Sequence, residues 1–128
     1  MLKIKIKTIP NRKQRYPTAG DWYDDGNTHE IRVSELSNPK YELLIAVHEL
    51  IESELCRQRG ISEEAVTRFD RWFEEARNLG LLYNDDEPGF HPNAPYKNEH
   101  TFATMIERQL AKELGVDWES YAREIEKL

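Results

Sequence analysis

The chain has 128 residues, of which 38% are hydrophobic and 33% charged, a composition that fits one folded globular domain spanning residues 1–128. It contains no apolar run of the about 20 residues that a membrane helix requires, and its Lys-rich start lacks the features of a signal peptide, so we expect neither membrane association nor export. The net charge of -6 disfavours nucleic acid as a partner, and a single cysteine, Cys56, favours a reducing, cytoplasmic location.

Strand patterns come first along the chain. From Leu2 to Ile9 apolar residues alternate with lysines, which predicts a strand with one solvated face. A second β region begins near Trp22, and an Asp-Gly pair favours a tight turn before the chain returns as Thr28 to Val33. These segments predict a small, largely antiparallel sheet.

Helical signals follow the strands. A helix is predicted from Pro39 to about Arg59, with Asn38 as its N-terminal cap and proline in the first turn, where its missing N–H costs nothing. A second helix is predicted from a cap at Ser62 to about Leu79. Each of the two helices is followed by a glycine, which favours its termination.

The last third of the chain combines a loop with two further helices. Residues from Asn84 to Tyr96 are rich in Asp, Pro, Gly and Asn, which predicts an irregular loop of a length that often carries function. A third helix is predicted from about Asn98 to Gly115, and a short last helix after its cap at Asp117. The fold class expected is α+β, with a small antiparallel sheet packed against three main helices plus a short C-terminal helix.

The helix from Pro39 carries the residues that point to chemistry. His48 and Glu52 are one turn apart on the same face, within a stripe of apolar residues. A buried, charged carboxylate needs a compensating partner, and a divalent metal between Glu52 and His48 would satisfy both. Glu49 lies about 100° further round the helix, where it could accept a proton from a metal-bound water. We therefore predict a metal site, with zinc as the favoured ion and Glu49 as the catalytic base.

A third protein ligand must come from elsewhere in the chain. The start of the third predicted helix offers Glu99 and His100, and the preceding loop offers His91. We favour His100, because a neutral imidazole beside Glu52 completes a two-histidine, one-carboxylate set of the kind that catalytic zinc uses. Asp70 and Glu107 are further candidates, either as ligands or as hydrogen-bond acceptors that orient an imidazole, with Glu107 assigned to His100.

Two resemblances add to this interpretation. A strand ending at residues 31–33, followed by a helix that reads LLIAVHELIE, resembles the strand and active-site helix of zincin metallopeptidases, although Glu52 stands where that family has its second histidine. Asn98 and Glu99 also resemble the Asn-Glu pattern that supplies the third ligand in gluzincins. The segments HELIE, CRQRGIS, HPNAPYKNEH and LGVDWESY resemble small, uncharacterised phage and prophage proteins.

The resemblance implies a zincin-like fold and a zinc-dependent hydrolase, in its specific form a minimal metallopeptidase. It also implies that a peptide or protein substrate pairs with a sheet edge near Ile31 to Val33. One alternative is a non-catalytic, phage-encoded metal-binding protein that engages a host protein on the same scaffold. Another is an all-α nucleotide pyrophosphohydrolase, because Glu49 and Glu52 resemble half of its magnesium-binding carboxylate set, although the predicted strands argue against it.

Overall fold

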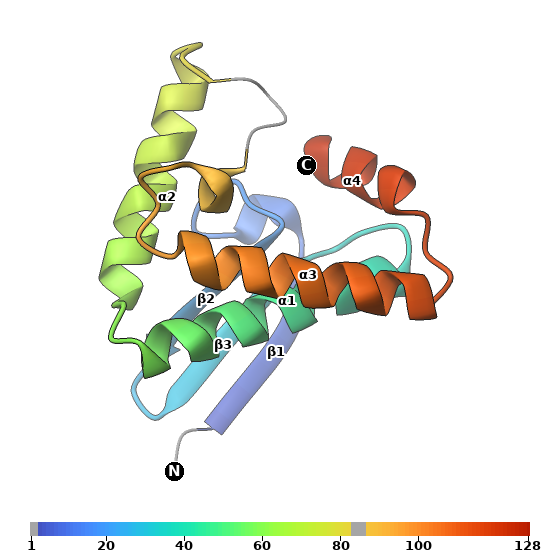
Figure 1. Cartoon of the computed structure of the whole chain (residues 1–128), viewed down its shortest axis with the longest axis horizontal. Coiled ribbons are helices and arrows are strands. Elements are labelled where there is room, and N and C mark those ends of the chain that lie inside the picture. The colour runs from blue at the N-terminus through green and yellow to red at the C-terminus, as the bar shows by residue number, and fades with distance from the viewer. Residues whose placement is uncertain (1–2, 83–86) are drawn as a thin grey trace.

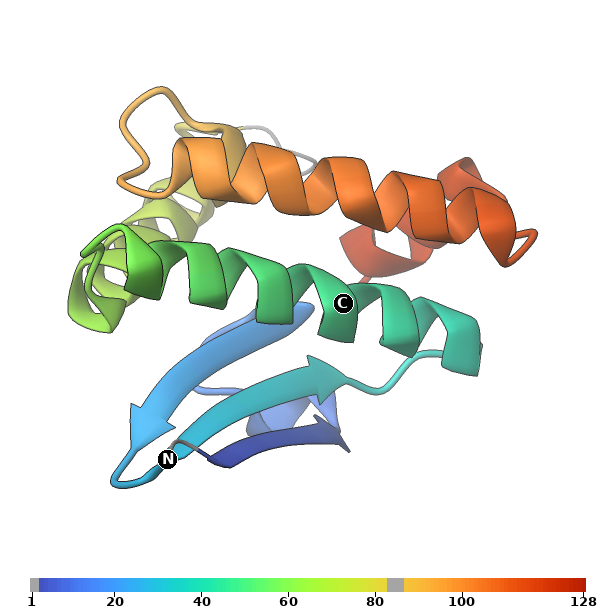
Figure 2. The ribbon, with the colours of Figure 1, turned by 60° about the horizontal axis from the view of Figure 1, so that its bottom comes forward.

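The computed structural model of the chain describes residues 3–82 and 87–128. Among these residues a three-stranded sheet packs on one side of α1 (Pro39–Gln58), and α3 (Lys97–Glu113) packs on the other side of that helix (Figure 1, Figure 2). The predicted α+β class is therefore confirmed, and the all-α alternative is wrong. Because α1 touches both the sheet and α3, its buried face determines what lies at the centre of the protein.

The sheet is mixed, in contrast to the predicted antiparallel arrangement. Its order is β1-β3-β2, formed by β1 (Lys3–Ile9), β3 (Thr28–Ser34) and β2 (Gly20–Asp25). The hairpin of β2 and β3 is antiparallel as predicted, and Gly26 supplies the positive φ of 60° in its turn. However, the connection at residues 10–19 carries β2 past β3, so that β3 returns between the other two strands and runs parallel to β1.

β3 is the central strand, which corrects one prediction. Ile31 and Val33 are completely buried, and β3 pairs with β1 along one side and with β2 along the other. Its backbone groups are therefore used within the sheet, and the predicted substrate-pairing edge at residues 31–33 is wrong. The edges of the described sheet are β1 and β2.

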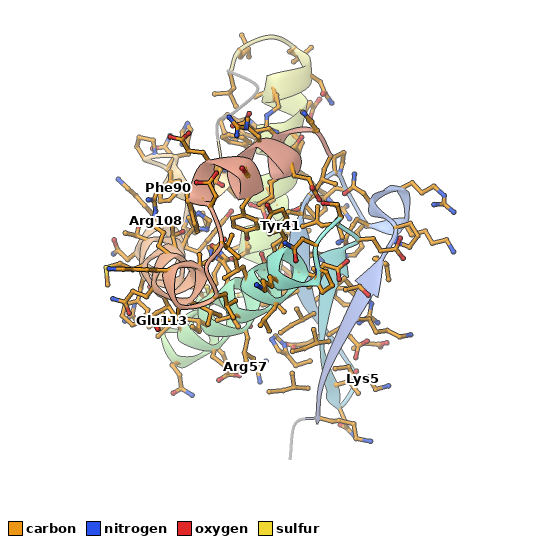
Figure 3. The ribbon with its side chains drawn as sticks, turned by 90° about the vertical axis from the view of Figure 1, so that its right-hand side faces the viewer. Lys5, Tyr41, Arg57, Phe90, Arg108 and Glu113 are labelled. Atoms are coloured by element: carbon orange, nitrogen blue, oxygen red, sulfur yellow. The ribbon has the colours of Figure 1, made fainter. Side chains whose placement is uncertain are left out.

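β1 lies at the margin of the protein. Ile4 and Ile6 are 46% and 48% exposed, so the face predicted to be buried is only half covered, while Leu2 lies outside the described residues. Figure 3 shows Lys5 on the side of the sheet away from the helices. β1 consequently adds a hydrogen-bonded edge to the sheet but little to the core.

The remaining helices begin and end close to the predicted positions. Side chains of Asn38, Ser62 and Asp117 cap α1, α2 and α4, accepting hydrogen bonds from backbone N–H groups at 2.9, 3.1 and 3.1 Å. Within residues 87–96, the described part of the predicted loop, there is one short 3-10 helix. The bounds of these elements are α2 (Glu63–Asn78), α4 (Trp118–Glu126), η1 (Asn11–Lys13) and η2 (Pro88–Phe90).

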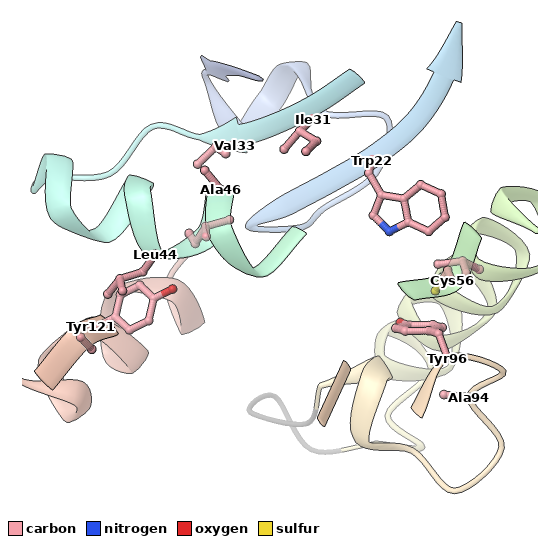
Figure 4. Close-up of a cluster of buried hydrophobic side chains, with 12 residues drawn as sticks. Trp22, Ile31, Val33, Leu44, Ala46, Cys56, Ala94, Tyr96 and Tyr121 are labelled. Atoms are coloured by element: carbon pink, nitrogen blue, oxygen red, sulfur yellow. The ribbon is translucent and has the colours of Figure 1, made fainter. Parts of the chain in front are cut away.

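The core lies between the sheet and α1 and continues to α4. In Figure 4, Leu44 lies beside Tyr121, while Trp22 faces Cys56 and Tyr96. Cys56 is completely buried among these side chains, as predicted for an apolar core residue. No helix within the described residues is long and apolar enough to cross a membrane.

Candidate metal centre

α1 directs two ionisable side chains into the protein interior. His48 and Glu52 are only 7% and 4% exposed, because their neighbours on this face, Leu44, Ile45 and Cys56, belong to the hydrophobic core. One helical turn separates the two residues, so their side chains project in the same direction. Removing a carboxylate from water in this way requires compensation by other polar groups.

α3 supplies the third side chain. Nδ1 of His100 lies 2.8 Å from Oε2 of Glu52 and 3.1 Å from Nε2 of His48, and this Nε2 is 3.0 Å from the same Oε2. One atom from each side chain thus contributes to a nearly equilateral triangle, which we call the ligand triangle. The structure therefore brings together the three residues that the sequence analysis selected as ligands, between α1 and α3.

The ligand triangle fits a small divalent cation. Tetrahedral zinc with nitrogen and oxygen ligands at about 2.0–2.1 Å places neighbouring ligand atoms about 3.3 Å apart. The observed separations of 2.8–3.1 Å are a few tenths of an ångström shorter, so a small outward movement of the side chains would admit an ion. Two imidazole nitrogens and one carboxylate oxygen also form a donor set that catalytic zinc uses, with a fourth position open for water.

Glu107 orients the imidazole of His48. Nδ1 of His48 donates to Oε1 of Glu107 at 2.7 Å, and the hydroxyl of Tyr121 donates to the other oxygen of the same carboxylate. A carboxylate that accepts from Nδ1–H leaves Nε2 as the atom that faces the ligand triangle, which is the usual arrangement around metal-binding histidines. The assignment of Glu107 to His100 was therefore wrong, because its partner is His48.

The two oxygens of Glu52 have different partners. Oε2 belongs to the ligand triangle, and Oε1 accepts a hydrogen bond from the indole Nε1 of Trp22 at 3.3 Å. Burial alone would raise the pKa of Glu52, but hydrogen bonds from His100 and His48 outweigh burial and lower it to about 2. Glu52 is consequently a carboxylate at neutral pH.

The short helix η2 encloses His100. Nε2 of His100 has no hydrogen-bond partner within the described residues, although Oε2 of Glu87 lies 3.5 Å away. Gly89 packs on the ring so closely that a Cβ there would lie 2.2 Å from Cγ of His100, and the ring of Phe90 stands edge-on at 4.6 Å. Burial opposes a proton on His100, but the hydrogen bond to Glu52 and the nearby carboxylate of Glu87 raise its pKa to about 9.

Glu49 lies beside the ligand triangle without belonging to it. Its side chain lines the same cavity, and no hydrogen bond joins it to another described residue. Burial raises the pKa of Glu49 well above its usual value, and the charge of Glu52 raises it further. β2 approaches closely at Gly20, where a Cβ would lie 2.7 Å from Oε1 of Glu49, so the absence of a side chain there keeps space for this carboxylate.

The ligand triangle opens into a cavity of about 820 Å³. This volume is within the range of pockets that hold small ligands or a few residues of a peptide. β2, α1, α2, α3 and α4 all contribute to its walls, and the lining includes the aromatic residues Trp22, Tyr96 and Trp118. The candidate ligands are therefore accessible from a chamber rather than enclosed in the core.

Two of the alternative ligands lie elsewhere. Oε2 of Glu99 forms an ion pair with Nη1 of Arg59 at 2.7 Å. His91 packs against Phe69, with the ring centroids 5.5 Å apart, and its Nδ1 accepts from the backbone N–H of Asn93. Neither side chain contributes to the ligand triangle. Glu99 precedes His100 by one residue and therefore points about 100° away from it around the helix.

Asp70 also lines the cavity but does not contact an imidazole. Its carboxylate accepts hydrogen bonds from the hydroxyl of Tyr16 at 2.9 Å and from the hydroxyl of Tyr96. Burial raises the pKa of Asp70 to about 7, although the tyrosine hydrogen bonds oppose this rise. The predicted role of Asp70 as a ligand or as an imidazole acceptor is therefore not reflected in its contacts.

Several residues of the site carried no recognisable sequence signal. Trp22 of β2 and Glu87, in the loop before η2, contact candidate ligands, and Tyr121 of α4 contacts Glu107, the partner of His48. Aromatic and acidic residues are common in such segments, and only the folded chain brings these three to the centre. For Glu87 and Gly89, the only indication of a role was that they belong to the Asp-, Pro- and Gly-rich segment predicted as a functional loop.

Comparisons of the chain with protein-family models, curated proteins and solved structures find no match. A function for this protein must therefore be inferred from the geometry and chemistry of the ligand triangle and its cavity.

Proposed function

We propose that this protein is a zinc-dependent hydrolase, in its specific form a minimal metallopeptidase. In this proposal His48, Glu52 and His100 are the metal ligands and Glu49 is the general base. The observation that carries it is the convergence of three ligand atoms within 2.8–3.1 Å on the wall of a cavity that also receives Glu49. The zincin resemblance, the phage relationship and the cytoplasmic location belong to the same proposal.

Each residue has a distinct role in the proposed reaction. A bound zinc ion would supply Lewis acidity, lowering the pKa of a coordinated water towards 7 and polarising a substrate carbonyl. Glu49 would accept the proton of the attacking water and pass it to the leaving amine. Although burial and Glu52 raise the pKa of Glu49, the positive charge of a nearby cation lowers the pKa of a carboxylate. Glu49 would thus be ionised in the metal-loaded protein.

The same proposal includes an extended peptide as substrate. β2 is an edge strand of the described sheet, and Gly20, Asp21 and Trp22 line the cavity. An extended peptide can add to such an edge through backbone hydrogen bonds. Pairing with β2 replaces the pairing with residues 31–33 that the zincin resemblance implied, because β3 has no free edge.

The test separates metal binding from hydrolysis. Purified protein loaded with zinc is incubated with a peptide library, and cleavage is followed by mass spectrometry. Glu49→Gln should retain zinc and lose about 10²- to 10⁴-fold in cleavage rate, since it removes only the general base. Glu54→Gln is the matched control, because Glu54 lies on the same helix but outside the cavity lining, and it should cleave like the wild type. Equal rates for Glu49→Gln and the wild type would refute the assignment of Glu49.

A non-catalytic, metal-binding protein that engages a host partner is the second candidate. Glu52 in place of a histidine favours it, because this position departs from the active-site helix of the zincin metallopeptidases. In that case zinc would bind to the ligand triangle, but no peptide in the library would be cleaved. Glu49→Gln would then leave the biological effect of the protein unchanged.

A further inference from the structure

A chain of buried hydrogen bonds connects the C-terminal helix to the ligand triangle. The hydroxyl of Tyr121 on α4 donates to Oε2 of Glu107 on α3, and Oε1 of Glu107 accepts from Nδ1 of His48 on α1 at 2.7 Å. The three residues are 1%, 7% and 7% exposed, so water hardly competes for these bonds. α4 is thereby connected to a candidate ligand through two hydrogen bonds.

The chemistry of the groups determines which one donates and which one accepts in these two hydrogen bonds. An ionised carboxylate can only accept, so Glu107 requires a donor at each of its oxygens. Burial and the charge of Glu107 raise the pKa of Tyr121, which keeps its hydroxyl protonated as one donor. The other donor is Nδ1–H of His48, and Nε2 is then the ring atom that remains for an ion.

Tyr121 is also the main attachment of α4. Among the residues of α4, all of which are described, only Tyr121 is buried. Its ring packs against Tyr41 of α1 and Trp118, with centroids 5.2 Å apart in each pair, and Figure 3 shows Tyr41 between α1 and α4. Further contacts of α4 are the exposed hydrogen bonds of Glu124 to Ser37, the packing of Ile125 on the core, and the guanidinium of Arg108 over the Trp118 ring.

We propose that Tyr121 is a positioning residue of the metal centre and that docking of α4 and binding of a divalent cation stabilise each other. Tyr121 holds the carboxylate of Glu107 towards His48, and Glu107 holds the ring so that Nε2 meets the ion. A cation on Nε2 in turn polarises the ring and strengthens the bond from Nδ1–H to Glu107. Coupling between two binding equilibria is reciprocal, so each event favours the other.

This inference rests on the proposed function, since it requires a metal on His48. It extends that function, because Trp118, Tyr121 and Ile125 of α4 form part of the cavity wall. Metal loading would therefore stabilise the wall against which a substrate binds.

Zinc affinity in competition with a chromogenic chelator tests the first half of the inference. Removing an acceptor that orients a metal ligand commonly weakens metal binding about 10- to 100-fold. We expect the zinc affinity of Glu107→Gln to fall by an amount in this range. The zinc affinity of Tyr121→Phe should fall about tenfold. Tyr41→Phe is the matched control, because it removes a hydroxyl from the other ring of the same pair, and that hydroxyl makes no hydrogen bond within the described residues. Tyr41→Phe should bind zinc like the wild type.

Hydrogen exchange of residues 117–128 tests the second half. Zinc should slow exchange in this segment of the wild type and of Tyr41→Phe, and the effect should be largely lost in Tyr121→Phe. If Tyr121→Phe binds zinc as tightly as Tyr41→Phe, or if zinc leaves exchange in α4 of the wild type unchanged, the inference is overturned while the proposed metal site stands. If the wild type binds no zinc, the proposed function itself is refuted and the inference with it. Should Tyr121→Phe fail to fold, the affinity of Glu107→Gln decides the role of the hydrogen-bond chain.

Discussion

Among the described residues, two clusters around a buried histidine use similar side chains in different ways. One is the ligand triangle with its cavity. The other, which we call the His29 cluster, consists of His29 with Asp24, Ser53 and Arg57. Nδ1 of His29 lies 2.7 Å from Oδ1 of Asp24 and 2.9 Å from Nη2 of Arg57, and Nε2 lies 2.8 Å from Oγ of Ser53. Both clusters join α1 to another element through an imidazole, but only the residues of the ligand triangle line the cavity of about 820 Å³.

The two clusters differ in whether a ligand can reach them and in how many potential metal-binding atoms converge at one point. His29 and Ser53 are completely buried, and Ser53 also donates to the backbone oxygen of Leu50 at 3.1 Å. The order of groups resembles a nucleophilic triad, yet a serine that no substrate can reach has no such role. In the ligand triangle two nitrogens converge on one oxygen of Glu52, and the cavity leads to them. The same residue types thus form a structural cluster in one place and a candidate site in the other.

Deleting one histidine from each cluster is the strongest way to test this comparison. His48→Ala removes one of three ligands and should abolish stoichiometric zinc binding, as measured by elemental analysis after dialysis. His29→Gln should leave the zinc content unchanged, because His29 contributes no atom to the ligand triangle. If His48→Ala retained one zinc per chain, the ligand triangle would not be the metal site. Circular dichroism of both variants checks that they remain folded.

The pH dependence of zinc affinity sharpens the comparison further. The hydrogen bond to Glu52 and the nearby carboxylate of Glu87 raise the pKa of His100 to about 9 despite its burial, and hydrogen bonds to Glu107 and Glu52 likewise raise the pKa of His48. Zinc binds the neutral imidazole, so at pH 7 it must displace a proton, and this cost disappears as the pH rises towards 9. The apparent affinity should therefore increase about tenfold per pH unit for each displaced proton between pH 6.5 and 8.5.

Competition with a chelator, corrected for the chelator's own protonation, measures this profile. The release of protons on zinc addition, followed by calorimetry in buffers of different ionisation enthalpy, gives the number of protons directly. His29→Gln should show the same profile as the wild type. A pH-independent affinity over this range would mean that His100 is already neutral in the metal-free protein.

Local sequence patterns predicted the helices well, and they singled out two of the three residues that form the ligand triangle. His48 and Glu52 stand out because polar residues interrupt the apolar stripe of a capped helix, and both signals lie within one segment of the chain. The direction of β1 was not predictable in this way, because its parallel pairing with β3 depends on the path of residues 10–19. The hairpin alone is local, and it alone was predicted with its correct orientation.

The third residue of the ligand triangle and the residues that support it depend on contacts between distant segments. His100 could be selected over Glu99 only from the chemistry of the donor set, since both lie in the first turn of α3. The bond between His48 and Glu107 joins residues 59 positions apart, so their pairing follows from the packing of α3 on α1 rather than from either segment. His29 had no role predicted from the sequence, because its partners come from β2 and α1.

The smallest expected effect concerns the stability of the His29 cluster. Ser53→Ala removes the hydroxyl that lies between Nε2 of His29 and the backbone oxygen of Leu50, and it leaves a buried ring nitrogen without a partner. We expect a loss of about 1–3 kcal/mol in the free energy of unfolding, the cost of an unsatisfied buried polar group. Urea denaturation of the metal-free protein measures this loss. Thr101→Ala is the control, because it removes an exposed side-chain hydrogen bond on α3, and it should change the free energy of unfolding by less than about 0.5 kcal/mol. Because the hydrogen bonds of the Ser53 hydroxyl go to His29 and Leu50 rather than to the ligand triangle, zinc affinity should stay at the wild-type value. A variant that lost zinc while remaining folded would show that the two clusters are coupled through α1.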